Sequence, residues 1–175
     1  MSWSDPESSI KIKEPALALH RDDLTELPNP FLNHLERIVT PAASRQLLEG
    51  ALDVGEFEAV LQGGAPWQYH GANIHLGELP VVAFISGPAQ GLIQASNDLT
   101  LVLGYGGEKR VRQKGVLWTC RENTCLLLAP KSSWSFEHTL ASNVVFRIPV
   151  ETLKRTAMAM GGWREAPPQW QERME

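Results

Sequence analysis

Five histidines are the residues of this sequence best suited to bind a metal or transfer protons at neutral pH. His70, His75 and Glu78 form the pattern H-x4-H-x2-E, which offers two imidazoles and a carboxylate. In an unbroken strand, residues five apart point to opposite faces, so only a bulge at a neighbouring glycine would bring these side chains together. We therefore predict no metal and no cofactor, and keep a metal-dependent enzyme using His70, His75 and His138 as an alternative.

Other catalytic signatures fail. No G-x-S-x-G elbow occurs, and the glycine cluster Gly104–Gly107 matches neither a dinucleotide-binding nor a phosphate-binding loop, so we interpret it as a hairpin turn. Cys120 and Cys125 flank four residues in which Asn123 suits a positive φ, which predicts a hairpin with the two thiols facing each other. These are packed thiols or, alternatively, a redox switch. The sequence predicts a protein that is not an enzyme.

The clearest alternation lies in the strand expected over 133–138. Trp134, Phe136 and His138 share one face, and the residues between them share the other. Together with Trp118 of the preceding hairpin, they are our candidate ligand-binding residues, because aromatic walls supply apolar contact and His138 one hydrogen bond. The same side chains could instead fill a core, with His138 an ordinary histidine at its edge.

Length and charge narrow the class of protein. A chain of 175 residues is long enough for one domain. Its net charge of −4 argues against direct binding to nucleic acid. The row Arg110, Arg112 and Lys114 is expected to be a solvated outer face rather than a phosphate track. The sequence has no membrane-length apolar run and no signal peptide, so we expect a cytoplasmic protein without membrane contact.

Turn residues and helix-start signals predict the secondary-structure elements of the chain. Residues 1–28 are expected to be a flexible arm, and 29–55 to hold short helices over Phe31–Val39 and Ala42–Leu52, opened by Asn29-Pro30 and Thr40-Pro41. Short β-rich runs separated by turn residues over 56–149 predict an antiparallel sandwich or barrel. Its last strand, Asn143–Ile148, should turn Val144, Phe146 and Ile148 inward.

A helix is predicted over 150–162, followed by a linker over 163–175. One side of this helix carries a stripe of apolar residues at helical spacing. The candidate interface residues on this stripe are Val150, Leu153, Ala157 and Met160. Because the stripe is short, we expect at most a weak homodimer.

The C-terminal half resembles a known family. The hairpin WTCRENTCLLLAP, an aromatic strand and the segment NVVFRIPVETLKRTAMAMGG are similar to the cupin-like N-terminal sensor domain of AraC-type transcription regulators. The most specific part is Phe146-Arg147-Ile148-Pro149 through Leu153. The resemblance implies a mainly β, cupin-like antiparallel jelly roll with short N-terminal helices and a C-terminal amphipathic helix.

The resemblance also implies a function. Such a domain binds a small-molecule effector inside the β-sandwich and controls helix-turn-helix units that follow it, so DNA would be contacted only through a C-terminal domain missing from this chain. Two alternatives stay open beside this sensor. One is a small metal-dependent cupin enzyme. The other is a non-catalytic interaction module with a filled core, marked by an interior with no cavity larger than a few waters.

Overall fold

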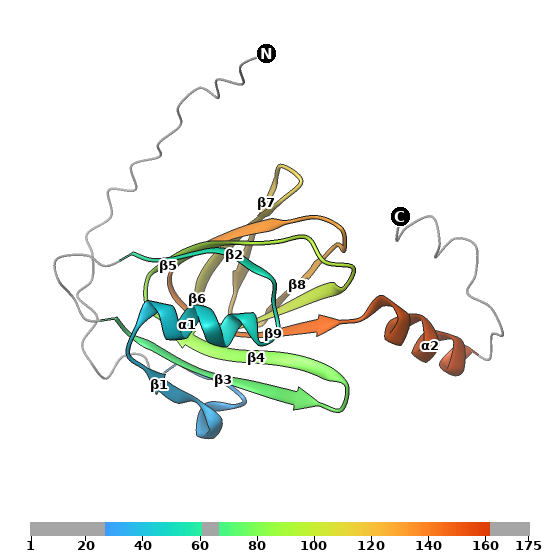
Figure 1. Ribbon diagram of the computed structural model, residues 1–175, viewed down its shortest axis with the longest axis horizontal. Helices are drawn as coiled ribbons and strands as arrows, with labels where there is room; N and C mark the ends of the chain where they lie inside the picture. Colours follow the sequence, from blue (N-terminus) through green and yellow to red (C-terminus); the bar gives the residue numbers. More distant parts are fainter. Residues whose placement is uncertain (1–26, 61–66, 162–175) are drawn as a thin grey trace, which may run out of the picture.

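The computed structural model describes residues 27–60 and 67–161, so most of the expected arm and the whole expected linker lie outside the described residues. Strands dominate, and the predicted mainly β, antiparallel fold is confirmed (Figure 1). The helical elements are a 3-10 turn at Leu32–His34, α1 at Pro41–Glu49 and α2 at Val150–Gly161. The strands are β1 Glu36–Ile38, β2 Val54–Ala59, β3 Tyr69–Leu76, β4 Leu79–Ser86, β5 Ala89–Ile93, β6 Leu99–Gln113, β7 Val116–Arg121, β8 Thr124–Leu128 and β9 Trp134–Ile148.

Two long strands, β6 and β9, pair along their length and run through both layers of the sandwich. The second half of β9 pairs with β4, and the first half of β6 pairs with β8, which gives the layer β1-β3-β4-β9-β6-β8. The first half of β9 pairs with β5, and the second half of β6 pairs with β7, which gives the layer β2-β5-β9-β6-β7. The core lies between these layers.

Bulges in both long strands change which residues point inward. Gly104 pairs with Asn143 and Gly106 with Ser142, which leaves Tyr105 as an extra residue in β6. Likewise Thr139 is an extra residue in β9, between the pairs Lys109–His138 and Glu108–Leu140. Each extra residue reverses the alternation of side chains in its strand.

The bulges overturn two predictions. The cluster Gly104–Gly107 is no hairpin turn but the bent middle of β6, where Gly107 has φ +70° and a Cβ would lie 2.1 Å from the carbonyl oxygen of Leu140. Val144 and Phe146 do not point into the sandwich. They pack in a second cluster on the outer side of their layer, whose other members are Val81, Ala83, Phe31, Leu35, Ile74, Leu103 and Tyr105.

The predicted cysteine hairpin is also wrong. β7 and β8 both pair with β6 in the same direction, one after the other, so they form an interrupted strand and not a hairpin. Glu122 and Asn123 bridge them, and Asn123 does adopt the expected positive φ, at +59°. Cys120 is buried and Cys125 is exposed, so the thiols do not face each other. The true hairpin turn is Lys114-Gly115, where both φ angles are positive, as a type I′ turn requires.

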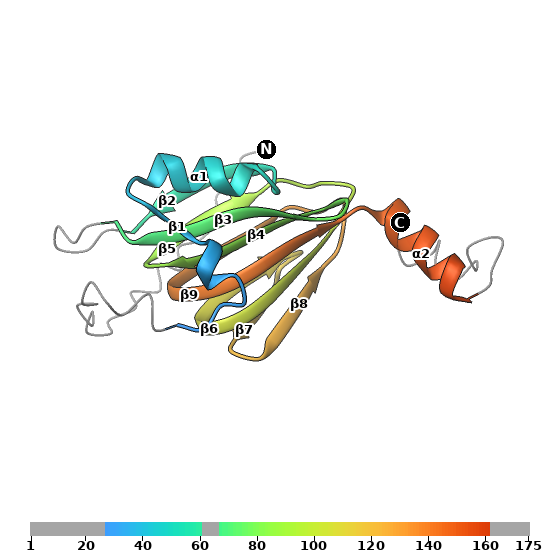
Figure 2. The same cartoon turned by 90° about the horizontal axis from the view of Figure 1, so that it is seen from below.

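The first helical prediction is half right. Thr40 caps α1 by accepting a hydrogen bond from the backbone N–H of Ala43, and Pro41 occupies its first turn. The helix expected over Phe31–Val39 is replaced by the 3-10 turn and β1, because β1 gains a partner in β3 that a helix could not use. α1 packs over β1, β2 and β3 (Figure 2). It contributes Leu48 to the core, and Ala51 and Leu52, which follow the helix, are also core residues.

The predicted C-terminal helix is confirmed as α2. It follows β9 directly through Pro149 and stands off the end of the sandwich in both views (Figures 1 and 2). None of its residues is buried. Val150, Leu153 and Ala157 are half-buried, and Met160 is 85% exposed. Among the described residues, no helix combines the length and apolar character needed to cross a bilayer.

Candidate functional site

Aromatic rings line the space between the two layers and contact one another in series. Tyr69 and Phe84 are stacked with ring centroids 5.7 Å apart, and Phe136 and His138 are stacked at 5.8 Å. Successive rings along the series are Phe57, Trp67, Tyr69, Phe84, His138, Phe136 and Trp134. The Trp67 indole N–H donates to the Ser44 hydroxyl at 2.8 Å, which ties this wall to α1.

A lysine lies inside this aromatic wall. Lys109 of β6 is 2% exposed, and its Nζ lies 4.6 Å from the ring centroid of Phe136, 4.9 Å from Phe84 and 5.8 Å from Trp134. No carboxylate of the described residues forms an ion pair with it. Burial lowers the pKa of Lys109 to about 8, and the neighbouring sulfur of Cys120 opposes this shift. The rings stabilise the ammonium form without neutralising its charge.

His138 is the cross-strand neighbour of Lys109. Its Nε2 lies 3.1 Å from the Ser86 hydroxyl, and that hydroxyl donates its own proton to the carbonyl of Gly87 at 2.8 Å. When the Ser86 proton lies on the Gly87 carbonyl, the Ser86 oxygen accepts from an Nε2–H of His138, and in this tautomer Nδ1 is an acceptor. Nδ1 is buried and has no hydrogen-bond partner in the part of the chain that the structure describes.

The charge state of His138 follows from its surroundings. Burial, followed by the positive charge of Lys109, lowers the pKa of His138 to about 3, against an opposing hydrogen bond with the Gly87 backbone. The imidazole is therefore neutral at physiological pH. Tyr69 adds a third polar group: its hydroxyl is buried without a partner, and burial raises the pKa of Tyr69 above its ordinary value.

These polar groups surround a small cavity in the sandwich. Its volume is about 10 Å³, which is room for a single water. It is lined by Leu48, Leu52, Phe57, Tyr69, Phe84, Lys109, Trp134, Phe136, His138 and Val145. A cavity of this size meets the criterion for a filled core, which is an interior with no cavity larger than a few waters. A larger ligand would have to displace side chains.

Three of the four candidate ligand residues lie together. Trp134, Phe136 and His138 line the cavity from β9, whereas Trp118 is half-buried on β7 opposite Val111 and does not line it. Lys109 was missed, although alternation places it on the face opposite Arg110 and Arg112.

Tyr69 was missed as well, because its role depends on a pairing between β3 and β4. No local pattern in the sequence sets that pairing.

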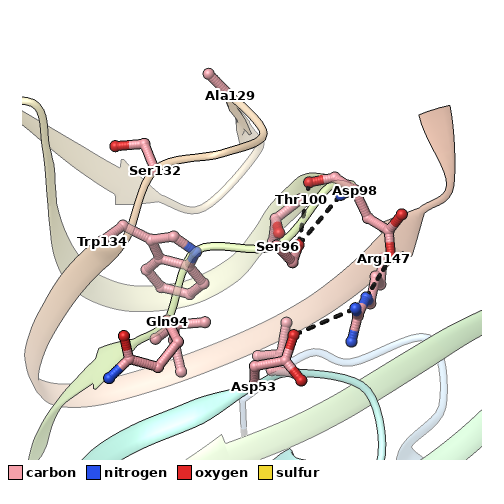
Figure 3. Close-up of a pocket in the computed structure, with 11 residues that line it drawn as sticks. Asp53, Gln94, Ser96, Asp98, Thr100, Ala129, Ser132, Trp134 and Arg147 are labelled. Atoms are coloured by element: carbon pink, nitrogen blue, oxygen red, sulfur yellow. Dashed lines mark hydrogen bonds and ion pairs between the residues drawn. The ribbon is translucent and has the colours of Figure 1, made fainter.

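A second hollow of about 10 Å³ is lined by residues that include Ser96, Trp134 and Arg147 (Figure 3). Trp134 and Leu52 line both. Arg147 of β9 crosses this hollow to Asp98, with Nε 2.5 Å from the carboxylate, and to Asp53 at 3.2 Å. This arginine joins the end of β9 to the connections before β2 and β6.

A wider groove lies on the outer face of the layer β2-β5-β9-β6-β7. It measures about 500 Å³ and is lined from β2, β5, β6, β7 and β9, with acidic and basic side chains mixed. Arg110 in this groove is paired with Glu108 and Glu137, each at 3.4 Å. Arg110 and Arg112 thus lie on the outer face, as predicted.

The histidine pattern considered for a metal is spread apart. β3 pairs with β4 without a bulge, so His70 and His75 point to opposite faces, and Glu78 pairs with Arg155 of α2 at 2.9 Å. Within residues 27–60 and 67–161, no group of three or more His, Cys, Asp or Glu side chains could hold a metal ion.

Comparisons with known proteins support the fold. The AraC-like transcriptional activator CuxR matches with a TM-score of 0.55 and 13% identity over 70% of this chain, and the match spans 49% of the activator's own length. The cupin domain of Schizosaccharomyces pombe Cnp3 has a TM-score of 0.43 at 9% identity, covering 53% of this chain and 76% of that one. The ectoine synthase of P. lautus has a TM-score of 0.41 at 13% identity, and the match covers 46% of this chain and 64% of the synthase.

The described residues therefore form a cupin-like β-sandwich, as predicted. Among its structural neighbours are both regulators and an enzyme. No family model matches the sequence, and no curated protein matches it.

Proposed function

We propose that this chain is the effector-sensing domain of an AraC-type transcription regulator, acting in the cytoplasm without catalysis. A small molecule binds inside the sandwich, and its occupancy controls a helix-turn-helix domain. The likeness of the fold to an AraC-like activator supports this function, as does the strand that leads through Ile148-Pro149 into α2.

The observation that carries the proposal is the buried ammonium of Lys109, which has no carboxylate partner among residues 27–60 and 67–161. Taking a charge out of water costs several kcal/mol unless a partner compensates, so a core that serves packing alone would hold a methionine or leucine here. The partnerless Tyr69 hydroxyl and His138 Nδ1 line the same cavity. Polar groups collected without partners are what a binding site presents to its ligand.

Strand β9 connects the cavity to α2. Trp134, Phe136 and His138 line the cavity from its first half, and its end continues into α2. A ligand that binds one arrangement of this strand more tightly shifts the population toward it and so changes the placement of α2. Arg147 fixes the end of β9 to Asp98 and Asp53, and sets one of these arrangements.

The apolar stripe of α2 is the proposed contact between two copies. Val150, Leu153, Ala157 and Met160 present a short surface, so we expect a weak homodimer that dissociates at micromolar concentration. Sedimentation of the Leu153→Glu variant would show only monomer at concentrations where the unmodified protein associates. A tight dimer unaffected by this change would place the interface elsewhere.

A reporter experiment tests the sensing role. Residues 1–175 are fused to a helix-turn-helix domain that binds its operator only as a dimer, and expression is measured against a metabolite library. We expect at least one compound to change expression in the unmodified fusion and to have no effect in the Lys109→Met fusion. A library without any Lys109-dependent response would contradict the proposal.

A non-catalytic interaction module is the second candidate, favoured by the cavity of only about 10 Å³. Its prediction is opposite: Lys109→Met would leave all binding partners of the protein in place, and no small molecule would raise its melting temperature.

A further inference from the structure

We propose that the interior site takes a small carboxylate, with the Lys109 ammonium as its counter-ion and the Tyr69 hydroxyl as a second hydrogen-bond donor. This inference rests on the proposed sensing function and names the chemical class of its ligand.

The charge of the cavity selects the ligand class. Among the described residues that line it there is no aspartate or glutamate, and Lys109 is the one cationic side chain, since His138 is neutral. A cationic ligand would be repelled, and an uncharged one would leave the ammonium without a counter-ion in a medium of low dielectric constant. One positive charge balances one negative charge, so a monoanion fits.

The hydrogen-bonding groups distinguish a carboxylate from other monoanions. Lys109 supplies N–H donors and Tyr69 an O–H donor, which suit the two oxygens of a carboxylate. Nδ1 of His138 is an acceptor without a partner, so it could accept from a hydroxyl that the ligand carries beside its carboxylate. The rings of Phe84 and Phe136 would pack against a short apolar chain.

Size and access restrict the ligand to a few carbon atoms. The cavity and the neighbouring hollow each measure about 10 Å³, and Trp134 and Leu52 line both. Trp134, Gln94 and Ser96 line the second hollow (Figure 3), so entry to the inner cavity through it would require the Trp134 indole to move. Propionate needs more room than the two waters that these hollows together would hold, so side chains lining the cavity must shift to admit it, and longer carboxylates should bind more weakly.

A set of three matched probes tests the charge. Propionate, propionamide and propylammonium have nearly the same shape and differ in charge, and each is titrated calorimetrically into the full chain at pH 7. We expect propionate to bind at least about tenfold more tightly than propionamide, and propylammonium not to bind. Lys109→Met should abolish the preference for propionate, whereas Lys114→Met, the same change at an exposed turn residue, should leave it intact.

Proton uptake by the unmodified protein provides a second readout. Among the titratable groups facing Lys109, His138 stays neutral and Tyr69 stays protonated, so the proton would go to Lys109, with the Cys120 thiol as the remaining neighbour. At pH 9 most Lys109 is deprotonated, and propionate should bind about tenfold more weakly than at pH 7 while taking up nearly one proton. Titrations in two buffers of different ionisation enthalpy measure this uptake, and Cys120→Ser excludes the thiol.

The outcomes separate the two proposals. If propionamide binds as tightly as propionate in a Lys109-dependent way, the carboxylate inference fails and the sensing function stands. The carboxylate inference also fails, and the sensing function also stands, if none of the probes gives Lys109-dependent binding at tens of millimolar but the reporter responds to a library compound. If propionate binds without proton uptake at pH 9, Lys109 is not its counter-ion. If neither probes nor library compounds act, both proposals fail.

Discussion

The two faces of the layer formed by β5, β9 and β6 hold cations under opposite conditions. On the outer face, Arg110 pairs with Glu108 and Glu137 at the solvent-open groove. On the inner face, its chain neighbour Lys109 is 2% exposed and contacts three rings but no carboxylate of the described residues. Exposed ion pairs contribute little to stability, whereas a buried charge without a partner costs several kcal/mol. The inner face therefore gives up stability, as expected if the proposed ligand binds there.

The largest expected effect comes from breaking the bulge that separates the two faces. In Gly107→Ala, the new Cβ would meet the carbonyl oxygen of Leu140 at 2.1 Å in a backbone with φ +70°. We expect a loss of about 4 kcal/mol in the free energy of unfolding, measured by urea denaturation. Gly115→Ala is the matched control, since its φ is +77° but nothing lies within 4 Å, and it should cost only about 1 kcal/mol. Equal losses would contradict this account of the bulge.

His138 tests how strongly the inner face excludes charge. Because its folded-state pKa of about 3 lies below the unfolded value of 6.5, the stability linked to it is complete above pH 6.5 and is lost as the pH falls toward 3. Between pH 7 and pH 4, the unmodified protein should lose about 3 kcal/mol more than His138→Gln. His75→Gln on the exposed part of β3 should behave like the unmodified protein. If the free energy of unfolding fell equally between pH 7 and pH 4 in all three proteins, protonation of His138 would carry no cost in stability.

Lys109 should change the stability in the same direction as His138, but in the alkaline range. Its folded-state pKa of about 8 lies below 10.5, so stability is lost as the pH falls through 8 and regained as it rises toward 10.5. From pH 7 to pH 9.5, the unmodified protein should gain about 2 kcal/mol relative to Lys109→Met, and the variant should be more stable at pH 7. His138, Tyr69 and Cys120 are present in both proteins, so their contributions cancel. A variant less stable than the unmodified protein at pH 7 would show that the three rings fully compensate the charge.

The outer face supplies the smallest effect. Arg110→Met removes a half-exposed cation from its two glutamates, and it should change the free energy of unfolding by less than about 1 kcal/mol. High salt should shrink even this difference, because exposed charges are screened. A loss comparable to those on the inner face would remove the contrast between the two faces.

Local sequence was sufficient for several features. The alternation of Trp134, Phe136 and His138 does place them together, and Thr40-Pro41 does open α1. Pro149 does end the last strand and lead into α2. These features depend on neighbours a few residues apart, so composition and spacing predict them.

Other features depend on pairing across the sheet. Tyr105 and Thr139 become extra residues only because β6 and β9 bend together from one layer into the other, and no local pattern marks them. That is why Val144 and Phe146 point outward, against the simple alternation, and why β7 and β8 continue along β6 in place of a hairpin.

Side-chain periodicity alone was enough to predict the antiparallel β character, the aromatic strand and the helix that follows it. The enclosure of Lys109 by rings from β4 and β9, and its separation from every carboxylate of the described residues, were decided only by the tertiary structure. The physical reason is that desolvation depends on what surrounds a group in space, and those surroundings come from strands far apart in the chain.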